Sequence, residues 1–317
     1  MISRCSYTSR AEHQERNITL EDLANDAPSV PLSAIGGDAS LTRELQTLLG
    51  QAGLLDPPVD GQFGPVSHWA LDALLRRLRL TGTKFIDATV ARALLDAADA
   101  DPFPINSRDT FAGRIVQALQ TKGHWIQRHP DCVNIVYIEG MDPDGAPNSN
   151  VPNEFNDTRF VLRITPSGLP ETVDAWEATT EPGIYYTVIK PLDPRGAARI
   201  AFGQYKAWSV GIHMAGKKSA HEALVQTAAI VVHRDLNEDF ERSDDATFQG
   251  LFGINQHCGY DMKKSDIGRA SAGCLVGRTK SGHAAFMRWC KDDPRYRANN
   301  SFRFITTVLR AADVPEA

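Results

Sequence analysis

Short β-rich runs separated by turn residues dominate the chain after about residue 130, and this pattern constrains the fold most. The runs span residues 133–138, 159–164, 185–189, 223–232 and 302–309, with clusters of Gly, Pro, Asn and Asp between them. They alternate with turns and not with long helices, which favours a sandwich or barrel over a doubly wound sheet. We expect one helix before the runs, over residues 111–127, and one late helix over residues 282–292.

The first hundred residues have a different, helical pattern. Leu45, Leu48 and Leu49 form one apolar stripe, a second lies within residues 66–78, and a third helix is expected over residues 89–95. Residues before 38 lack periodicity, and Pro102 and Pro104 mark a linker between separable domains. The sequence therefore predicts an α+β chain with four parts: a loose leader (1–37), a small three-helix domain (38–97), a linker (98–110) and a mainly β domain (111–317).

Charge and hydropathy argue against two classes of function. The 317 residues hold 34 Lys and Arg against 39 Asp and Glu, a formal net charge of −5, which offers no basic footprint for nucleic acid. No apolar run reaches the ~18 residues of a membrane span, and residues 1–25 lack the apolar core of a signal peptide. We therefore expect synthesis in the cytoplasm, so that any action outside the membrane needs a route other than general secretion.

Two segments carry the residue types of a cysteine nucleophile and its base. They read GINQHCG over residues 253–259 and SAGCLV over residues 271–276. A thiol attacks a carbonyl as the thiolate, and an imidazole supplies this form by taking the proton and later returning it to the leaving amine. We therefore predict Cys274 as nucleophile and His257 as base. Gly273 permits a sharp turn whose amides can bind an oxyanion, and Ser271 can hydrogen-bond within the same turn.

These segments resemble the catalytic domain of the L,D-transpeptidases, in which a His precedes a Ser/Thr-His-Gly-Cys motif by a dozen or more residues. Here 13 residues, 258–270, lie between the His and the motif. The resemblance places the nucleophile on Cys274, the base on His257, the motif Gly on Gly273 and the motif Ser on Ser271. It covers roughly residues 130–312 and implies a divergent branch of that fold.

The chain departs from the family motif at two places. Ala272 replaces the motif His, and the Arg that often follows the Cys closely is absent, the nearest being Arg278. Polar residues within otherwise β-like runs are typical of residues that line a cleft. We therefore predict that Arg199, Tyr205 and His213 contact the substrate. These two departures affect the prediction of the substrate specificity and of the reaction more than the assignment of Cys274 as nucleophile.

The amino-terminal helices resemble a small peptidoglycan-binding domain. The resemblance covers roughly residues 38–97 and rests on Leu45-Gln46, a turn at Gly53, and the sequence DGQFG at residues 60–64. It implies that this part binds the bacterial cell wall. An inert helical cap is the alternative.

Three alternatives concern other thiols and carboxylates. Cys258 adjoins His257, but successive strand residues point to opposite faces, so we expect this thiol to face away from the site. A zinc site built on His257, Cys258 and Cys274 has an uncommon ligand spacing. The run Asp235-x-Asn237-x-Asp239, with acids at 244 and 245, has the spacing of a calcium loop but lacks its glycine, and an acidic turn is the commoner explanation. We expect no metal and no cofactor.

Together these observations predict an enzyme that acts on peptidoglycan stem peptides through a thioester on Cys274. In the family, the thiolate attacks the carbonyl of the third stem residue and expels the terminal D-alanine. Water then gives carboxypeptidase or endopeptidase cleavage, and an amine gives a crosslink or an exchanged D-amino acid. Without an export signal, a phage lysin or an injected antibacterial effector, acting in the periplasm or cell wall, fits better than a resident wall-building enzyme. The alternative is a peptidoglycan-binding module that has lost activity, as Ala272 in the motif indicates.

Overall fold

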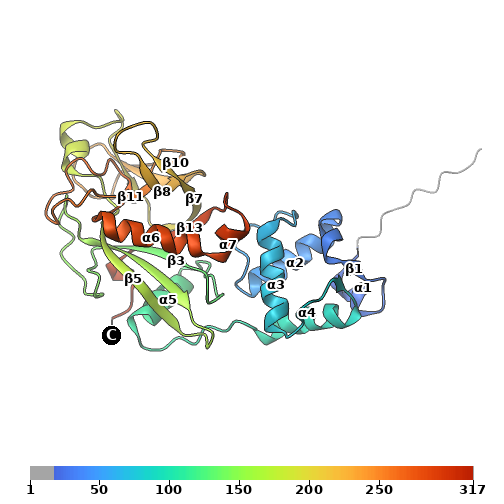
Figure 1. Cartoon of the computed structure of the whole chain (residues 1–317). Helices are drawn as coiled ribbons and strands as arrows, with labels where there is room; N and C mark the ends of the chain where they lie inside the picture. The colour runs from blue at the N-terminus through green and yellow to red at the C-terminus, as the bar shows by residue number, and fades with distance from the viewer. Residues whose placement is uncertain (1–17, 317) are drawn as a thin grey trace, which may run out of the picture.

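The structure is a computed structural model that describes residues 18–316, and it combines several helices with a large, mainly β sheet (Figure 1). The helices are α1 (Leu20–Ala24), α2 (Ala39–Gln51), α3 (Pro65–Arg77), α4 (Ala88–Ala100), α5 (Phe111–Thr121), α6 (Lys280–Asp292) and α7 (Pro294–Ala298). Short 3₁₀ turns are η1 (Leu32–Gly37) and η3 (Ala311–Asp313), and η2 (Tyr185–Ile189) is a π-helix. The strands are β1 (Val30–Pro31), β2 (Phe85–Ile86), β3 (Asn134–Glu139), β4 (Asp157–Ile164), β5 (Pro170–Thr179), β6 (Ala197–Ile200), β7 (Gly203–His213), β8 (His221–Gln226), β9 (Ile230–Asp235), β10 (Ala246–Gly250), β11 (Gln256–Cys258), β12 (Leu275–Gly277) and β13 (Phe304–Arg310).

The amino-terminal part forms a helical domain with its own core. Helix α2 begins at Asp38, whose carboxylate accepts the backbone N–H groups of Ser40 and Leu41, and α4 begins at Asp87 in the same way. Helix α3 starts with Pro65, which needs no hydrogen-bond acceptor at that position. Fully buried leucines at the expected spacing join the three helices: Leu41, Leu45, Leu49, Leu74 and Leu94. The three predicted helices are therefore present.

The described part of the predicted leader is not loose. Residues 18–37 contain α1, η1 and a strand, β1, that pairs with β2. Leu20 and Leu23 are completely buried in the helical core, and the Arg92 guanidinium of α4 donates to the carbonyl of Ala24 at 2.7 Å. The helical domain therefore extends at least to residue 18, and residues 1–17 lie outside the described part of the chain.

The carboxy-terminal part is built around a closed array of eight strands in the order β11-β12-β5-β4-β3-β13-β7-β8. Strand β11 pairs parallel with β12 and β3 with β13, and the other neighbours are antiparallel. Residues 135–138 of strand β3 are buried on both faces: Ile135 and Tyr137 share a core with α6, whereas Val136 and Ile138 pack against α5. A separate three-stranded sheet, β10-β9-β6, flanks this array.

Two of the predicted β runs fold differently. Residues 185–189 form the π-helix η2, in which the backbone N–H of Lys190 donates to the carbonyl of Tyr185 at 2.8 Å, five residues earlier. Only Thr187 of this helix is fully buried, so the apolar run covers little core. Residues 223–232 belong to two strands, β8 and β9, which lie in different sheets. The remaining predicted runs match β3, β4 and β13, and the late helix matches α6.

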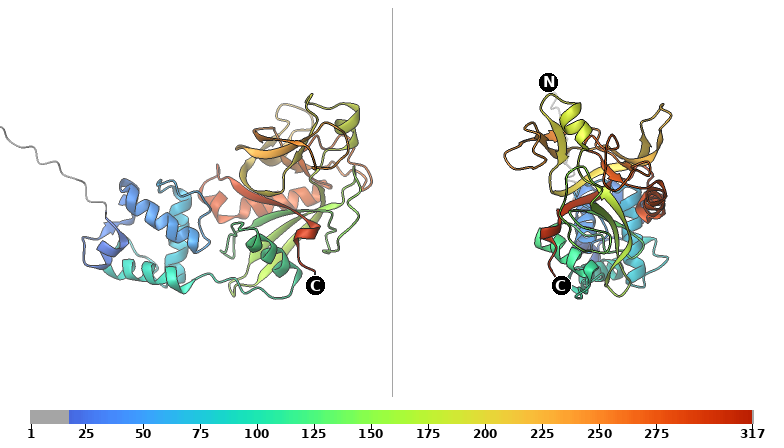
Figure 2. Two further views of the ribbon diagram at one scale, coloured as in Figure 1. Left: turned by 180° about the vertical axis from the view of Figure 1, so that it is seen from behind. Right: turned by 90° about the vertical axis from the view of Figure 1, so that its left-hand side faces the viewer.

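The two parts of the chain contact one another closely (Figures 1 and 2). The carboxylate of Asp56, 2 % exposed, lies 2.7 Å from the Lys206 ammonium and 3.8 Å from the Arg295 guanidinium. The ring of Trp69 on α3 meets that of His129 edge to face at 5.2 Å between centroids. The helical domain is therefore docked on the β domain rather than joined to it by the linker alone.

Candidate active site

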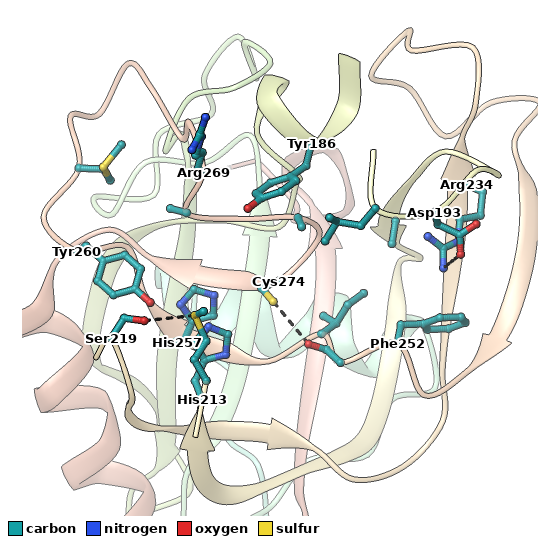
Figure 3. A pocket seen from close by; sticks show the side chains of 18 residues that line it. Tyr186, Asp193, His213, Ser219, Arg234, Phe252, His257, Tyr260, Arg269 and Cys274 are labelled. Carbon is teal, nitrogen blue, oxygen red and sulfur yellow. Dashed lines mark hydrogen bonds and ion pairs between the residues drawn. The ribbon is translucent and has the colours of Figure 1, made fainter. Parts of the chain in front are cut away.

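Two neighbouring strands place His257 and Cys274 beside one cavity. Strands β11 and β12 pair in parallel with His257 opposite Val276, and Cys274 directly precedes β12. The backbone N–H of Leu275 donates to the carbonyl of Asn255 at 3.0 Å, which holds the two segments together. Both side chains line a cavity of about 740 Å³ (Figure 3). Strand pairing thus brings together residues that the sequence separates by a long loop.

The turn before the thiol depends on Ser271 and Gly273. The Ser271 hydroxyl accepts from the backbone N–H of Gly273 at 3.1 Å and donates to the carbonyl of Cys274 at 2.9 Å. Gly273 has φ 118°, and a Cβ at this position would lie 2.4 Å from the carbonyl oxygen of Ala198 in β6. Only glycine fits this close approach of two backbones.

One backbone amide remains available near the thiol. The N–H of Gly273 is occupied by Ser271, which corrects the expectation that both turn amides can receive an oxyanion. The N–H of Cys274 has no hydrogen-bond partner among residues 18–316. This group can stabilise negative charge that develops on a carbonyl held beside the sulfur.

The local contacts of His257 define which ring nitrogen is basic. Its Nδ1 lies 2.9 Å from the carbonyl of Cys258, so Nδ1 carries the proton and donates it, and Nε2 keeps the lone pair. The side chain is 2 % exposed. Burial, and next the neighbouring His213, hold the pKa of His257 well below its usual value. His257 is therefore a neutral base at neutral pH.

The Cys274 thiol is also neutral in this structure. Its Sγ accepts from the backbone N–H of Asn255 at 3.4 Å and lies 3.7 Å from the carbonyl of Gly253, to which it donates (Figure 3). Burial raises the pKa of the thiol to about 11, and the Asn255 N–H opposes that rise. The resting site thus holds a thiol and an imidazole rather than a thiolate–imidazolium pair.

Three further histidines surround His257. The ring of His213, at the end of β7, stacks on His257 with centroids 3.9 Å apart, and its Nδ1 accepts from the Asn255 amide at 3.0 Å. His221 and His283 also belong to this cluster. The ring centroids of His221 and His257 are 5.7 Å apart, and those of His221 and His283 are 5.8 Å apart. Burial lowers the pKa of His213 to about 4 and that of His283 to about 3, so these two rings carry little positive charge at neutral pH.

The three predicted substrate-contacting residues have different places. His213 lines the cavity. Arg199 does not, because β6 directs its side chain into the interior, where it is 1 % exposed and paired with Glu181. Tyr205 also lies outside the cavity lining, and its hydroxyl donates to the carbonyl of Ala201 at 2.9 Å. The structure therefore corrects the substrate-contact prediction for Arg199 and Tyr205.

Several cavity residues were not identified from the sequence. They include aromatic and cationic side chains from η2, β9 and three loop positions: Tyr186, Arg234, Phe252, Tyr260 and Arg269. Tyr260 and Asp261 are consecutive residues with φ of 60° and 64°, and Asp261 accepts the first N–H of α6 at 2.8 Å. From the sequence, only Tyr260 could have been predicted to line the cavity, because it follows His257 by three residues.

The alternative metal sites receive no support from the geometry. Asp235 is completely buried and accepts the backbone N–H groups of Asp239 and Phe240 at 3.2 and 3.1 Å, as in an acidic turn. Cys258 hydrogen-bonds to His221 at 3.4 Å and lines a different cavity from Cys274. Within residues 18–316, no group of three or more His, Cys, Asp or Glu side chains is arranged to hold a metal ion.

Comparisons with known proteins do not assign a family. No family model, no curated protein and no solved structure matches this chain. A search of the described residues for helices long and apolar enough to cross a bilayer finds none. Any function therefore has to be argued from the residues of the site.

Proposed function

We propose that this chain is a cysteine acyltransferase or hydrolase that acts on peptidoglycan stem peptides, with Cys274 as nucleophile and His257 as base. The observation that carries the proposal is the parallel pairing of β11 and β12, which places the two side chains on one cavity. The resemblance of their motifs to those of L,D-transpeptidases supplies the substrate class.

The first step of the proposed reaction uses His257 as a general base. The thiol turns from the Gly253 carbonyl toward His257, whose Nε2 takes its proton while the sulfur attacks the carbonyl carbon of the third stem residue. The Cys274 N–H donates a hydrogen bond to the oxyanion. The intermediate then collapses, the amide C–N bond breaks, and His257 returns the proton to the nitrogen of the departing D-alanine. A thioester on Cys274 remains.

The second step resolves the thioester. Water or an amine attacks the thioester carbonyl, His257 takes the proton of this nucleophile, and the sulfur leaves as a thiolate that regains the proton. Water yields a shortened peptide, and an amine yields an exchanged or crosslinked one. We expect hydrolysis or exchange to exceed crosslinking, as in a phage lysin or an injected antibacterial effector.

The composition of the cavity supports a peptide substrate with anionic groups. Apolar surface comes from Met214, Phe252 and Ile254, and polar ends come from Tyr260 and Arg269. The guanidinium of Arg269 lies over the Tyr185 ring at 4.0 Å and has no ion-pair partner among residues 18–316, so it can meet a carboxylate. Apolar walls with a few placed polar groups are typical of small-ligand sites.

The helical domain is proposed to hold the chain on the wall. The Asp-Gly turn that carries the resemblance is tied to α2, because Gln46 donates to the Asp60 carboxylate and accepts from the Gly61 N–H, both at 2.8 Å. Phe63 packs on the helical core. Anchoring raises the substrate concentration at Cys274. Sedimentation of the Cys274→Ala chain with purified sacculi tests this role, and failure to pellet contradicts it.

The second candidate function is a peptidoglycan-binding module without turnover. The hydrogen bond of the Cys274 thiol to Gly253, together with its raised pKa, favours this candidate, because neither prepares a thiolate. Ala272, which lines the cavity in place of the motif His, points the same way.

Chromatography of muropeptides separates the two candidates. We expect wild-type protein to convert a diaminopimelate tetrapeptide to tripeptide, or to a D-methionine adduct when D-methionine is added. Cys274→Ala abolishes both products while the thermal unfolding midpoint is retained, because alanine occupies the same turn. Full activity in Cys274→Ala excludes the proposed nucleophile. Binding without any product in the wild type supports the binding module.

A further inference from the structure

A second cavity, which we call the α6 basic pocket, lies beside the Cys274 cavity. Its volume is about 700 Å³, and its walls come from α6, β8 and the loop before β8. Four cationic side chains line it: Lys218, Lys280, Arg288 and Lys291. The chain as a whole has a net charge of −5, so this pocket is a local reversal of charge that attracts anions.

Two of the four cations already have a carboxylate partner, and two do not. Lys291 pairs with Glu222, which also lines the pocket, at 2.8 Å, and Lys280 lies 3.5 Å from Asp261, which does not line it. Lys218 and Arg288 have no carboxylate within ion-pair distance among residues 18–316. The pocket therefore offers two cations that a ligand can neutralise.

The lining of the pocket also includes apolar side chains. Buried Met287 and exposed Ala284 come from the same face of α6 as Lys280 and Lys291, and buried His283 lines the pocket too. Apolar groups beside cationic ones suit a ligand with a carbon chain and a terminal carboxylate, rather than a compact inorganic ion.

A thin wall separates this pocket from the Cys274 cavity. Ser219 and Tyr260 line both cavities. The His221 ring lines the basic pocket and meets the His257 ring at 5.7 Å between centroids. A peptide in the Cys274 cavity therefore needs to extend past only Tyr260 and Ser219 to place a side-chain carboxylate in the basic pocket.

We propose that the α6 basic pocket binds a carboxylate of the same peptide whose carbonyl lies at Cys274, and so selects stem peptides with free carboxylates over amidated ones. This inference rests on the proposed function for its substrate and on the four cations for its chemistry. Lys218 and Arg288 supply the ion pairs, because their charges have no partner within the described chain.

Calorimetry on the full Cys274→Ala chain tests this binding without turnover. The probes are a diaminopimelate tetrapeptide with free carboxylates and the same peptide with every carboxylate converted to a carboxamide. We expect the free form to bind more tightly, and the double variant Lys218→Gln/Arg288→Gln to weaken it roughly five- to tenfold while leaving the amidated form unchanged. The preference falls as salt is added.

A matched control comes from an exposed lysine of the helical domain. Lys84→Gln removes one positive charge at a residue that does not line the pocket, and it is expected to change neither affinity. Inorganic phosphate serves as a competitor: displacement of the peptide by equimolar phosphate identifies a general oxyanion site and overturns the peptide assignment. Equal binding of the free and amidated peptides overturns it as well.

Turnover by chains that keep Cys274 separates failure of this inference from failure of the proposed reaction. The double variant is expected to raise KM for the free peptide with little change in kcat, because the cations act in binding. Turnover with unchanged KM rejects the pocket and leaves the reaction in place. Carboxylate-dependent binding without turnover by the wild type rejects the reaction and supports the pocket.

Discussion

The imidazole rings of His213 and His257 lie face to face, with centroids 3.9 Å apart and planes inclined by 10°. His213 covers the ring of the base on one side, and its proximity contributes, after burial, to the low pKa of His257. A stacked, uncharged neighbour restrains the orientation of the base and excludes water from it. His213 is thus a positioning residue that acts through His257.

This stack has a consequence for the pH dependence of the rate. Because the pKa of His257 is lowered, its neutral form persists as pH falls below about 6.5, and the wild-type rate should stay level through that pH. His213→Ala admits water and should move the acid limb of kcat/KM upward, toward pH 6.5. His213→Phe keeps a flat ring and should restore the wild-type profile. Identical profiles for the Ala and Phe variants would remove the positioning role.

The turn at Gly273 gives a prediction on stability. Gly273→Ala forces a side chain into φ 118° and against the Ala198 carbonyl, so we expect a loss of about 3 kcal/mol or more in the free energy of unfolding. Gly37→Ala is the control, since a Cβ there meets nothing within 4 Å, and should change stability by less than about 0.5 kcal/mol. Urea unfolding measures both, and matching midpoints would contradict the close approach.

The contact between the two parts of the chain can be tested at Asp56. Asp56→Asn keeps the shape of the side chain but removes the charge that faces Lys206 and Arg295, and should cost about 1–3 kcal/mol of stability. Asp72→Asn breaks an exposed pair with Arg76 and should cost under about 0.5 kcal/mol. Equal losses for the two variants would mean that the interface charge is no more important than a surface pair.

A buried carboxyl that is not part of the catalytic pair should affect the pH dependence of the free energy of unfolding. Burial, and next the charge of Glu139, raise the pKa of Asp157 to about 7. Between roughly pH 4, where the unfolded group titrates, and pH 7, the folded chain holds the extra proton. Asp157 therefore contributes a loss of stability as pH rises through this window, on the order of 1 kcal/mol per pH unit. Asp157→Asn should lack this component in urea titrations at pH 5 and pH 7, and unchanged slopes would contradict it.

The sequence predicted the elements whose patterns are local. Helices α2, α3 and α4 have periodic leucines and clear first-turn signals, and β3 has an apolar run long enough to identify. The short helix α1 lacks such a period, because its five residues bury Leu20 and Leu23 only through contact with the rest of the domain. The run at 185–189 has β-branched and aromatic residues, yet it forms a helical turn that the hydrogen bond from the Lys190 N–H to the Tyr185 carbonyl closes.

The candidate site was only partly accessible from the sequence. Cys274 and His257 have distinctive neighbours along the chain, but the rings around them come from β7, β8 and α6 and meet only through strand pairing. Arg199 illustrates the converse: a polar residue in a β run resembles a cleft residue until its buried partner Glu181 is known. Separate domains were also expected from the prolines of the linker, whereas the contacts of Asp56 depend on residues distant along the chain, Lys206 and Arg295.

The mass of the intact protein during turnover tests the central claim most directly. Wild-type protein mixed with a diaminopimelate tetrapeptide and quenched in acid should gain the mass of the tetrapeptide minus one alanine. Digestion should place that adduct on the segment that contains Cys274, and Cys274→Ala should show none. Processing of the peptide with no adduct on Cys274, or with the adduct on Cys258, would contradict the role of Cys274 as nucleophile.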